Sequence, residues 1–263
     1  MRKAVNSADE LIQMFQDLQS RAVKSGGSEK KTYSCLKCQD KEGYITHDDN
    51  GYERWTFCEC HQQKRVDRLF KSSQITGNFQ KLGFRTFKRE ERPAIIQSAY
   101  NCAYTYYKDF DIIKEKRQNS IALLGEPGAG KTHLLMAIAN NLLKRGVGVS
   151  YFPWVEGFNE MKDNLDHLET RINRLQRVPV LFIDDLYKGR KEPTDFQIEQ
   201  LFAIVNYRYL HNLPLMISSE YDIDQLCGFD KAIGSRIFEM ARDYTVILRG
   251  DGLNYRISGG AAS

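Results

Sequence analysis

The stretch from Gly125 to Thr132 has the composition of a phosphate-binding loop. It reads GEPGAGKT and matches the pattern G-x-x-x-x-G-K-[ST]. Glycines allow the backbone to turn closely around a phosphate, and the loop amides can donate hydrogen bonds to phosphate oxygens. Lys131 is expected to reach the β- and γ-phosphates of a nucleotide, and the Thr132 hydroxyl to bind Mg²⁺. The residues expected to bind the nucleotide are Gly125, Glu126, Pro127, Gly128, Ala129, Gly130, Lys131, Thr132 and His133.

The residues on either side indicate that this loop joins a strand to a helix. Residues 121–124 form a short apolar run that suits a buried parallel strand. Apolar residues then recur with helical spacing between 134 and 143. A helix that begins at the loop directs its N-terminus at the bound phosphate. This context favours a nucleotide site over the alternative of a chance glycine-rich turn.

Two acids follow a second apolar strand, expected over residues 180–183. Next to a phosphate-binding loop, Asp184 is expected to hold the Mg²⁺ and Asp185 to polarise the attacking water. Without that loop, a strand followed by a polar turn would be the simpler interpretation. Asp185 is one methylene shorter than a glutamate, so we expect slow ATP hydrolysis that works as a switch.

The composition is that of an ordinary globular chain of 263 residues, 41% hydrophobic and 27% charged. The formal net charge is only +4, although basic residues outnumber acids between Lys64 and Arg92. Such a run is usually a solvated face and supports nucleic-acid contact only weakly. Since the sequence has no apolar run of membrane-spanning length and no signal sequence, we expect a cytoplasmic protein without membrane contact.

Four of the six cysteines lie close together, as the pairs Cys35/Cys38 and Cys58/Cys60. In a cytoplasmic protein, two close pairs about twenty residues apart are typical of a zinc site rather than of disulfides. A module this short would scarcely fold without the metal. We therefore expect Zn²⁺ on these four thiolates.

The zinc ligand set has alternatives, because the second pair is one residue tighter than C-x-x-C. His61 is a possible substitute for one thiol and His47 a weaker one, and four unconnected thiols would be the simplest non-metal interpretation. The two remaining cysteines, Cys102 and Cys227, are expected to be buried core residues.

The expected domain organisation has four parts. Residues 1–30 hold a short amphipathic helix that begins with a capping box, followed by a flexible break. Residues 31–70 are the zinc module, residues 71–95 a basic linker, and residues 96–263 the ATPase domain. In that domain strands and helices alternate, which predicts an α/β fold with a parallel sheet covered by helices. The expected elements span 121–124, 132–145, 148–152, 155–176, 180–183, 196–211, 213–218, 229–242 and 244–248.

The order of these motifs resembles an AAA+ ATPase. The phosphate-binding loop and the acid pair are followed by the strand that ends in Ser218, Ser219 and Glu220, and then by the sequence GSRI at 234–237. In that family a polar residue that closes this strand is sensor 1, and the resemblance assigns Ser219, with Ser218 and Glu220 as alternatives. The resemblance also implies that Arg236 is an arginine finger that reaches a neighbouring subunit's γ-phosphate, so that subunits associate through the ATP site.

Only about fifteen residues follow the last apolar strand, whereas most AAA+ proteins carry a helical lid there. A lidless core with a cysteine-rich front end is similar to the DnaC/DnaI family of helicase loaders. The resemblance implies an ATPase that binds a hexameric replicative helicase through the zinc module and places it on single-stranded DNA. The candidate DNA contacts lie on the helix after the second strand and include Trp154, Phe158 and Lys162. The two aromatic residues fit a core position better.

Two other functions remain open at this stage. One is an IstB-like transposition helper or another DNA-remodelling ATPase, which needs no helicase. The other is a nucleotide-binding adaptor without significant turnover.

Overall fold

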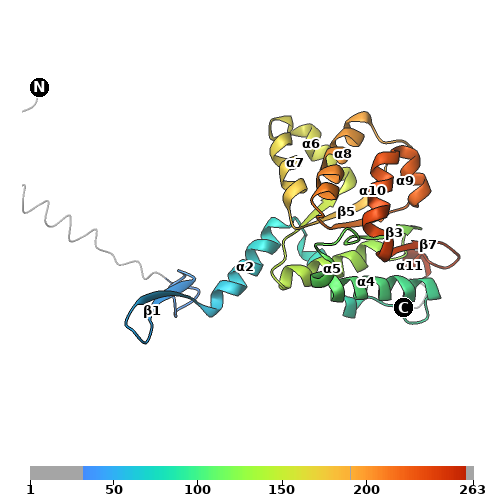
Figure 1. Cartoon of the computed structure of the whole chain (residues 1–263). Helices are drawn as coiled ribbons and strands as arrows, with labels where there is room; N and C mark the ends of the chain where they lie inside the picture. Colours follow the sequence, from blue (N-terminus) through green and yellow to red (C-terminus); the bar gives the residue numbers. More distant parts are fainter. Residues whose placement is uncertain (1–31, 190, 259–263) are drawn as a thin grey trace, which may run out of the picture. The chain divides into compact units, whose positions relative to one another are not determined.

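The computed structural model describes residues 32–189 and 191–258, which divide into two compact units at His61 and Gln62 (Figure 1). The expected N-terminal amphipathic helix lies outside the described residues. No helix in the described part of the chain is long and apolar enough to cross a membrane.

The first unit is built on a hairpin of two antiparallel strands, β1 (Gly43–His47) and β2 (Glu53–Phe57). Asp48 closes the turn, because its side chain accepts hydrogen bonds from the amides of Asn50 and Tyr52, both at 3.0 Å. The unit boundary falls within helix α2 (Glu59–Ser72), which begins directly after Cys58.

The second unit holds a five-stranded parallel sheet in the order β4-β5-β6-β3-β7. The strands are β3 (Ile121–Gly125), β4 (Val149–Pro153), β5 (Val180–Leu186), β6 (Leu215–Ser219) and β7 (Thr245–Leu248). Its central strands are apolar on both faces, as expected for a sheet that helices cover on each side. The sequence-based expectation of an α/β fold is therefore confirmed.

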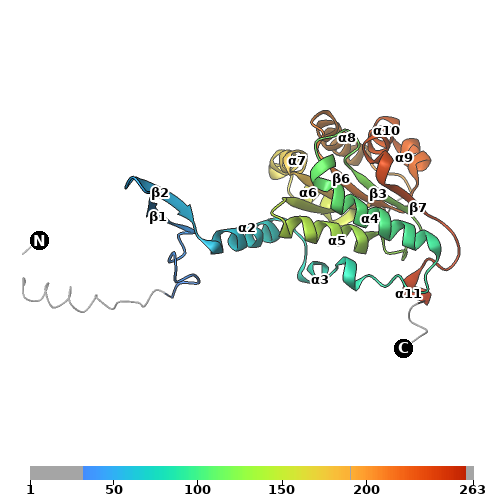
Figure 2. The same cartoon turned by 60° about the horizontal axis from the view of Figure 1, so that its bottom comes forward.

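Helices lie on both faces of this sheet (Figures 1 and 2). On one face, α4 (Ala94–Ile113) and α5 (Lys131–Lys144) enclose an apolar core with β3, β4 and β5. The helices of the other face are α6 (Trp154–Asp163), α7 (Leu168–Arg177), α8 (Asp195–Leu210), α9 (Ile223–Phe229) and α10 (Lys231–Ala241). Short segments complete the unit: α3 (Gly77–Gln80), α11 (Tyr255–Ser258) and the 3₁₀ turns Phe84–Thr86, Leu165–His167 and Arg242–Tyr244.

Two sequence-based expectations about this unit were wrong. The single helix expected over 155–176 is broken, because Asn164 adopts φ −141° and ψ 60° between α6 and α7. The segment expected to be a basic linker, 71–95, is part of the second unit. Its apolar residues Ile75 and Phe87 are buried in the core, and Asn140 of α5 donates hydrogen bonds of 2.8 Å to two of its carbonyls.

Candidate functional site

The acid pair lies in a β-bulge at the carboxyl end of β5. Ile183 pairs with Ile217 and Leu186 with Ser219, so two residues of β5 face one residue of β6. Asp184 and Asp185 are the two residues of this bulge, and Asp185 has a φ of 57°. A bulge interrupts the alternation of side chains along a strand. Both carboxylates consequently line the same cavity.

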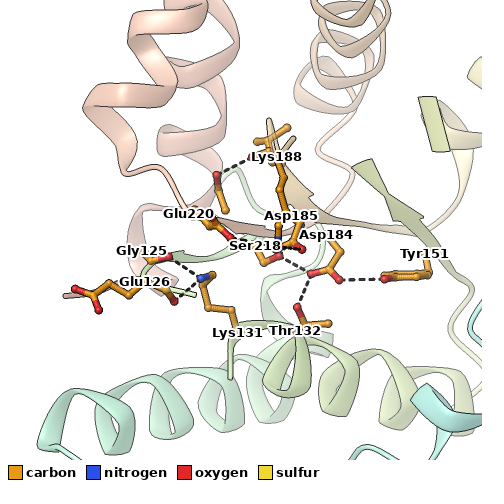
Figure 3. A network of polar contacts seen from close by, with 12 residues as sticks. Gly125, Glu126, Lys131, Thr132, Tyr151, Asp184, Asp185, Lys188, Ser218 and Glu220 are labelled. Atoms are coloured by element: carbon orange, nitrogen blue, oxygen red, sulfur yellow. Dashed lines mark hydrogen bonds and ion pairs between the residues drawn. The ribbon is translucent and has the colours of Figure 1, made fainter. Parts of the chain in front are cut away.

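Asp184 is held by three hydroxyl groups (Figure 3). Its Oδ1 accepts hydrogen bonds from Thr132 at 2.9 Å and from Ser218 at 2.5 Å, and its Oδ2 accepts one from Tyr151 at 3.0 Å. Burial raises the pKa of Asp184, while these hydrogen bonds lower it. Thr132 and Asp184, the two residues expected to bind Mg²⁺, therefore lie side by side. Oxygen ligands of this kind fit the preference of Mg²⁺, so Thr132 and Asp184 would hold the ion together with the nucleotide.

Asp185 forms an ion pair with Lys188, which also contacts Glu220. The Lys188 Nζ lies 2.8 Å from Asp185 Oδ2 and 3.2 Å from Glu220 Oε1. Asp185 thus lies beside Asp184 but in a charged environment, whereas Asp184 is buried among hydroxyl groups. The sequence motif did not indicate Lys188, which the structure adds to the site.

The amino group of Lys131 points into the phosphate-binding loop (Figure 3). Its Nζ donates hydrogen bonds of 2.6 Å to the Gly125 carbonyl and 2.7 Å to the Glu126 carbonyl. Burial lowers the pKa of Lys131, and the charge of Asp185 opposes that shift. A phosphate in the loop would replace these two carbonyls with a charged partner for the lysine.

Two glycines of the loop have positions that no other residue would fill easily. Gly130 has a φ of 99°, and a Cβ there would lie 2.7 Å from the Phe87 ring. Gly128 has a φ of 75°, and a Cβ there would lie 2.0 Å from the Asn254 side chain. Segments before and after the sheet thus pack directly on the loop.

Arg92 connects these two segments over the loop. Its guanidinium donates hydrogen bonds to the Ala129 carbonyl at 3.2 Å and to the Leu253 carbonyl at 2.9 Å. It also lies over the rings of Phe87 and Tyr255, at 5.6 and 5.3 Å from their centres. Phe87, Arg92 and Tyr255 line one cavity of about 1080 Å³ together with the loop and the acid pair. The cavity is large enough for a nucleotide.

The resemblance assigns sensor 1 to Ser219, with Ser218 and Glu220 as alternatives, and in the structure it is Ser218 that contacts the acid pair. The Ser219 hydroxyl is buried and donates to the Leu186 carbonyl at 2.8 Å. The Ser218 hydroxyl instead donates to Asp184 and accepts from the Asp185 amide at 2.8 Å. Tyr151 also contacts Asp184 and was missed, because its position on β4 follows an ordinary buried-strand pattern.

Arg236 lies outside the nucleotide cavity of its own chain. It lies on α10, where its Nη1 donates to the Ala232 carbonyl at 2.9 Å. Its guanidinium lies 5.5 Å from the ring centre of Phe202 and 5.3 Å from that of Tyr209. An action of Arg236 on a nucleotide would therefore concern a neighbouring subunit, and it stays a proposal.

The candidate DNA-contact aromatics are core residues. Trp154 is 2% exposed and Phe158 1% exposed, and the two rings pack edge to face. Neither ring is available to stack on a base. Lys162, on the same helix, is exposed.

The first unit brings its four paired cysteines together. The sulfurs of Cys35, Cys38, Cys58 and Cys60 all lie within 4.8 Å of one another. The Cys35–Cys58 and Cys38–Cys60 pairs are 3.7 and 3.4 Å apart. Four sulfurs at 2.3 Å from a tetrahedral zinc would be about 3.8 Å apart. The cluster therefore fits zinc well.

His61 is not part of the cysteine cluster. Its Nδ1 lies 2.8 Å from Glu42 Oε2, and its ring stacks on Phe57 at 4.3 Å.

The Cys38 amide hydrogen bonds to the Cys35 sulfur and lowers the pKa of that thiol to about 7. A thiolate is the form that binds a metal.

Comparisons with known proteins agree with this geometry. The family model described as "IstB-like ATP binding protein" matches residues 66–230. The phage-like element PBSX protein XkdC of Bacillus subtilis is 46% identical over 244 residues, which are 90% of this chain and 91% of XkdC. The replicative helicase loader DnaI of Bacillus subtilis is 28% identical over 172 residues, which are 63% of this chain and 52% of DnaI. A crystal structure of DnaI superposes with a TM-score of 0.55 at 25% identity, over 67% of this chain and 95% of that one.

Proposed function

Because the chain belongs to the family of IstB-like ATP-binding proteins and is homologous to the DnaC/DnaI loaders, we propose that it loads a hexameric replicative helicase onto single-stranded DNA. The observation that supports this proposal is that one chain holds both a nucleotide-sized cavity, lined by the phosphate-binding loop and the acid pair, and a unit with four clustered cysteines. The first supports a nucleotide-driven switch. The second supports a separate module for a partner.

In the proposed cycle the second unit binds and hydrolyses ATP. The loop amides and Lys131 would hold the phosphates, Thr132 and Asp184 the Mg²⁺, and Asp185 would orient the attacking water. Ser218, which contacts both acids, is the better candidate for sensor 1. Arg236 of a neighbouring subunit would supply a cation at the γ-phosphate. Mg²⁺ would polarise the γ-phosphate for the attack.

Asp185 would have to leave Lys188 to act on water, because its carboxylate is held in an ion pair. A bound triphosphate brings negative charge into the same cavity and would compete for Lys188. This supports slow turnover, as expected of a switch.

The hairpin of the first unit presents an exposed apolar row that suits a protein partner. The strand register places Ile45 opposite Trp55 on the same face as Phe57. These side chains are 56%, 55% and 63% exposed. Exposed apolar side chains that gather on one face often mark an interaction site. We assign this face to the helicase, and Zn²⁺ on the four cysteines would hold the hairpin in shape.

Co-migration with the purified cognate helicase hexamer in gel filtration tests the proposal. The full chain with ATP should shift to the hexamer peak, and Trp55→Ala should weaken the shift. Tyr52→Ala is the matched control, because Tyr52 is an exposed aromatic residue next to the hairpin turn and outside the row. A chain that hydrolyses ATP with single-stranded DNA but never binds the hexamer would instead be a DNA-remodelling ATPase.

A further inference from the structure

A groove in the second unit is lined by four basic side chains, Arg65 and Lys71 of α2 and Arg174 and Arg177 of α7. It consists of two hollows of about 620 and 630 Å³ that share Arg174 and Val178. Every charged residue that lines either hollow is basic. We call this surface the basic groove. It lies at the amino ends of β4 and β5, whereas the nucleotide cavity lies at their carboxyl ends.

The floor of the basic groove holds a polar group that lacks a partner. Ser150 is 1% exposed and lines the first hollow. Its hydroxyl has no hydrogen-bond partner among the residues that the structure describes. A buried hydroxyl without a partner is costly, so a ligand oxygen or an ordered water is expected there.

Backbone carbonyls hold two of the guanidinium groups in place around this floor. Arg65 donates to the Gly146 carbonyl at 3.2 Å, and Arg174 donates to the Ser72 carbonyl at the end of α2. Both side chains keep further N–H donors, because a guanidinium carries five. The first hollow is therefore lined both by cationic donors that backbone carbonyls hold and by an unpartnered hydroxyl, which suits phosphate oxygens.

An aromatic pair lies beside Arg177, one of the four cations. The guanidinium of Arg177 lies 6.0 Å from the ring centre of Tyr207 on α8. That ring stacks on His211 at 4.1 Å with 18° between the planes. Tyr207 is half-buried and His211 is exposed. Cations next to aromatic rings are the combination that proteins use for single-stranded nucleic acids.

We infer that the basic groove binds the phosphodiester backbone of single-stranded nucleic acid, with a base against the Tyr207–His211 pair. The inference rests on the proposed function for its choice of ligand, and it supplies a binding surface in place of the buried Trp154 and Phe158. An acidic protein segment could also form ion pairs with the four basic side chains. The aromatic pair beside Arg177 favours a nucleic acid as the ligand, because its bases can stack on the rings.

The salt dependence of DNA binding tests this inference. The full chain is titrated, without helicase, onto a fluorescent oligo-dT, and anisotropy is read at several salt concentrations. The Arg174→Gln/Arg177→Gln variant removes two charges and keeps amide donors for the Ser72 carbonyl. Each phosphate contact contributes about 0.7 to the slope of log K against log[salt] for single strands, so the slope should fall by roughly 1.4. Affinity should fall as well.

Lys108→Gln/Lys116→Gln is the control, since it removes two exposed charges on and just after α4. That variant should keep the slope, and both variants should keep the ATPase rate and the unfolding midpoint of the parent. In addition, Tyr207→Leu should lower DNA affinity while it leaves the salt slope unchanged, because stacking carries no phosphate charge.

The inference fails if the groove variant binds oligo-dT with the parent's slope, or if the parent binds no oligo-dT at low salt with or without ATP. It also fails if the groove variant loses the helicase but keeps the DNA, because the groove would then hold an acidic protein. If the parent does not co-migrate with the helicase in gel filtration, but the groove variant shows the predicted change in salt slope, the proposed function is overturned. The inference about the basic groove would still hold.

Discussion

The hydroxyl of Ser218 donates a hydrogen bond of 2.5 Å to Asp184, and the same oxygen accepts the amide of Asp185. One side chain at the end of β6 thus contacts both acids of the β5 bulge. Hydrogen bonds to a charged group contribute about 1.5–3 kcal/mol. Through these two hydrogen bonds, Ser218 links the position of the acid pair to strand β6.

Ser218→Ala should therefore lower ATP turnover roughly tenfold or more, since about 1.4 kcal/mol corresponds to a factor of ten. Nucleotide affinity should change much less, because Lys131 and the loop amides are untouched. Steady-state phosphate release and binding of a fluorescent ATP analogue measure the two effects. Ser219→Ala is the control and should keep the turnover, since its hydroxyl contacts the Leu186 carbonyl. Equal losses in both variants would contradict the assignment.

The contrast between these serines shows what sequence can reveal about the site. The phosphate-binding loop is a local pattern, so its strand, turn and helix could all be predicted. Which serine faces Asp184 depends on strand register. Ile183 pairs with Ile217, so Asp184 and Ser218 project on the same face, and no sequence pattern gives that pairing.

The packing of the segment before α4 could not be predicted from the sequence for a related reason. Its basic residues and glycines suggested a linker, but Phe87 packs on Gly130 and Arg92 reaches the carbonyls of Ala129 and Leu253. These contacts join residues far apart in sequence, the last pair by 161 positions. Such a contact leaves no periodic signal.

Zinc content tests the four-cysteine cluster. The intact protein should contain one zinc ion per chain, and Cys60→Ser should lose most of it. His61→Ala should retain the metal, because His61 is engaged with Glu42 and lies outside the cluster. Inductively coupled plasma mass spectrometry of the purified variants gives the stoichiometry. Zinc that stays with Cys60→Ser and leaves with His61→Ala would show that the ligand set is wrong.

Arg208 is a buried cation whose loss should destabilise the second unit strongly. It is 0% exposed and donates hydrogen bonds to five carbonyls, of Leu175, Gln176, Val178, Pro179 and Pro214. Burial lowers the pKa of Arg208 to about 9, so it stays protonated at neutral pH. Arg208→Met would leave those carbonyls without their donor.

We expect Arg208→Met to lower the free energy of unfolding by about 3–5 kcal/mol, as for other broken buried charge networks. Urea titration followed by far-UV circular dichroism measures the loss. Arg177→Met is a suitable control, because it is an exposed arginine and should cost less than about 0.5 kcal/mol. A small loss in Arg208→Met would mean that water replaces the guanidinium without cost.

His133 should make stability depend on pH. Burial lowers its pKa in the folded state, and the hydrogen bond to the Gly83 carbonyl opposes that shift. The unfolded chain then binds more protons than the folded one below the ordinary histidine pKa of about 6.5. Stability should fall as the pH drops from about 6.5 toward the folded pKa. Urea unfolding midpoints are measured at pH 7.5, 6.5 and 5.5 for both proteins, and the midpoint of His133→Gln should change less with pH than that of the parent. An identical pH dependence in both proteins would show that another group is responsible.

Transfer of the helicase to DNA tests the central proposal most directly. The cognate hexamer is incubated with a closed single-stranded DNA circle, which has no free end, and the helicase bound to the circle is counted after a high-salt wash. With ATP, the wild-type chain should raise that amount severalfold over helicase alone. Lys131→Ala should not, because the loop lysine is the principal cation expected at the phosphates. If helicase on the circle is the same with the wild-type chain, with Lys131→Ala and with neither, the protein is not a helicase loader.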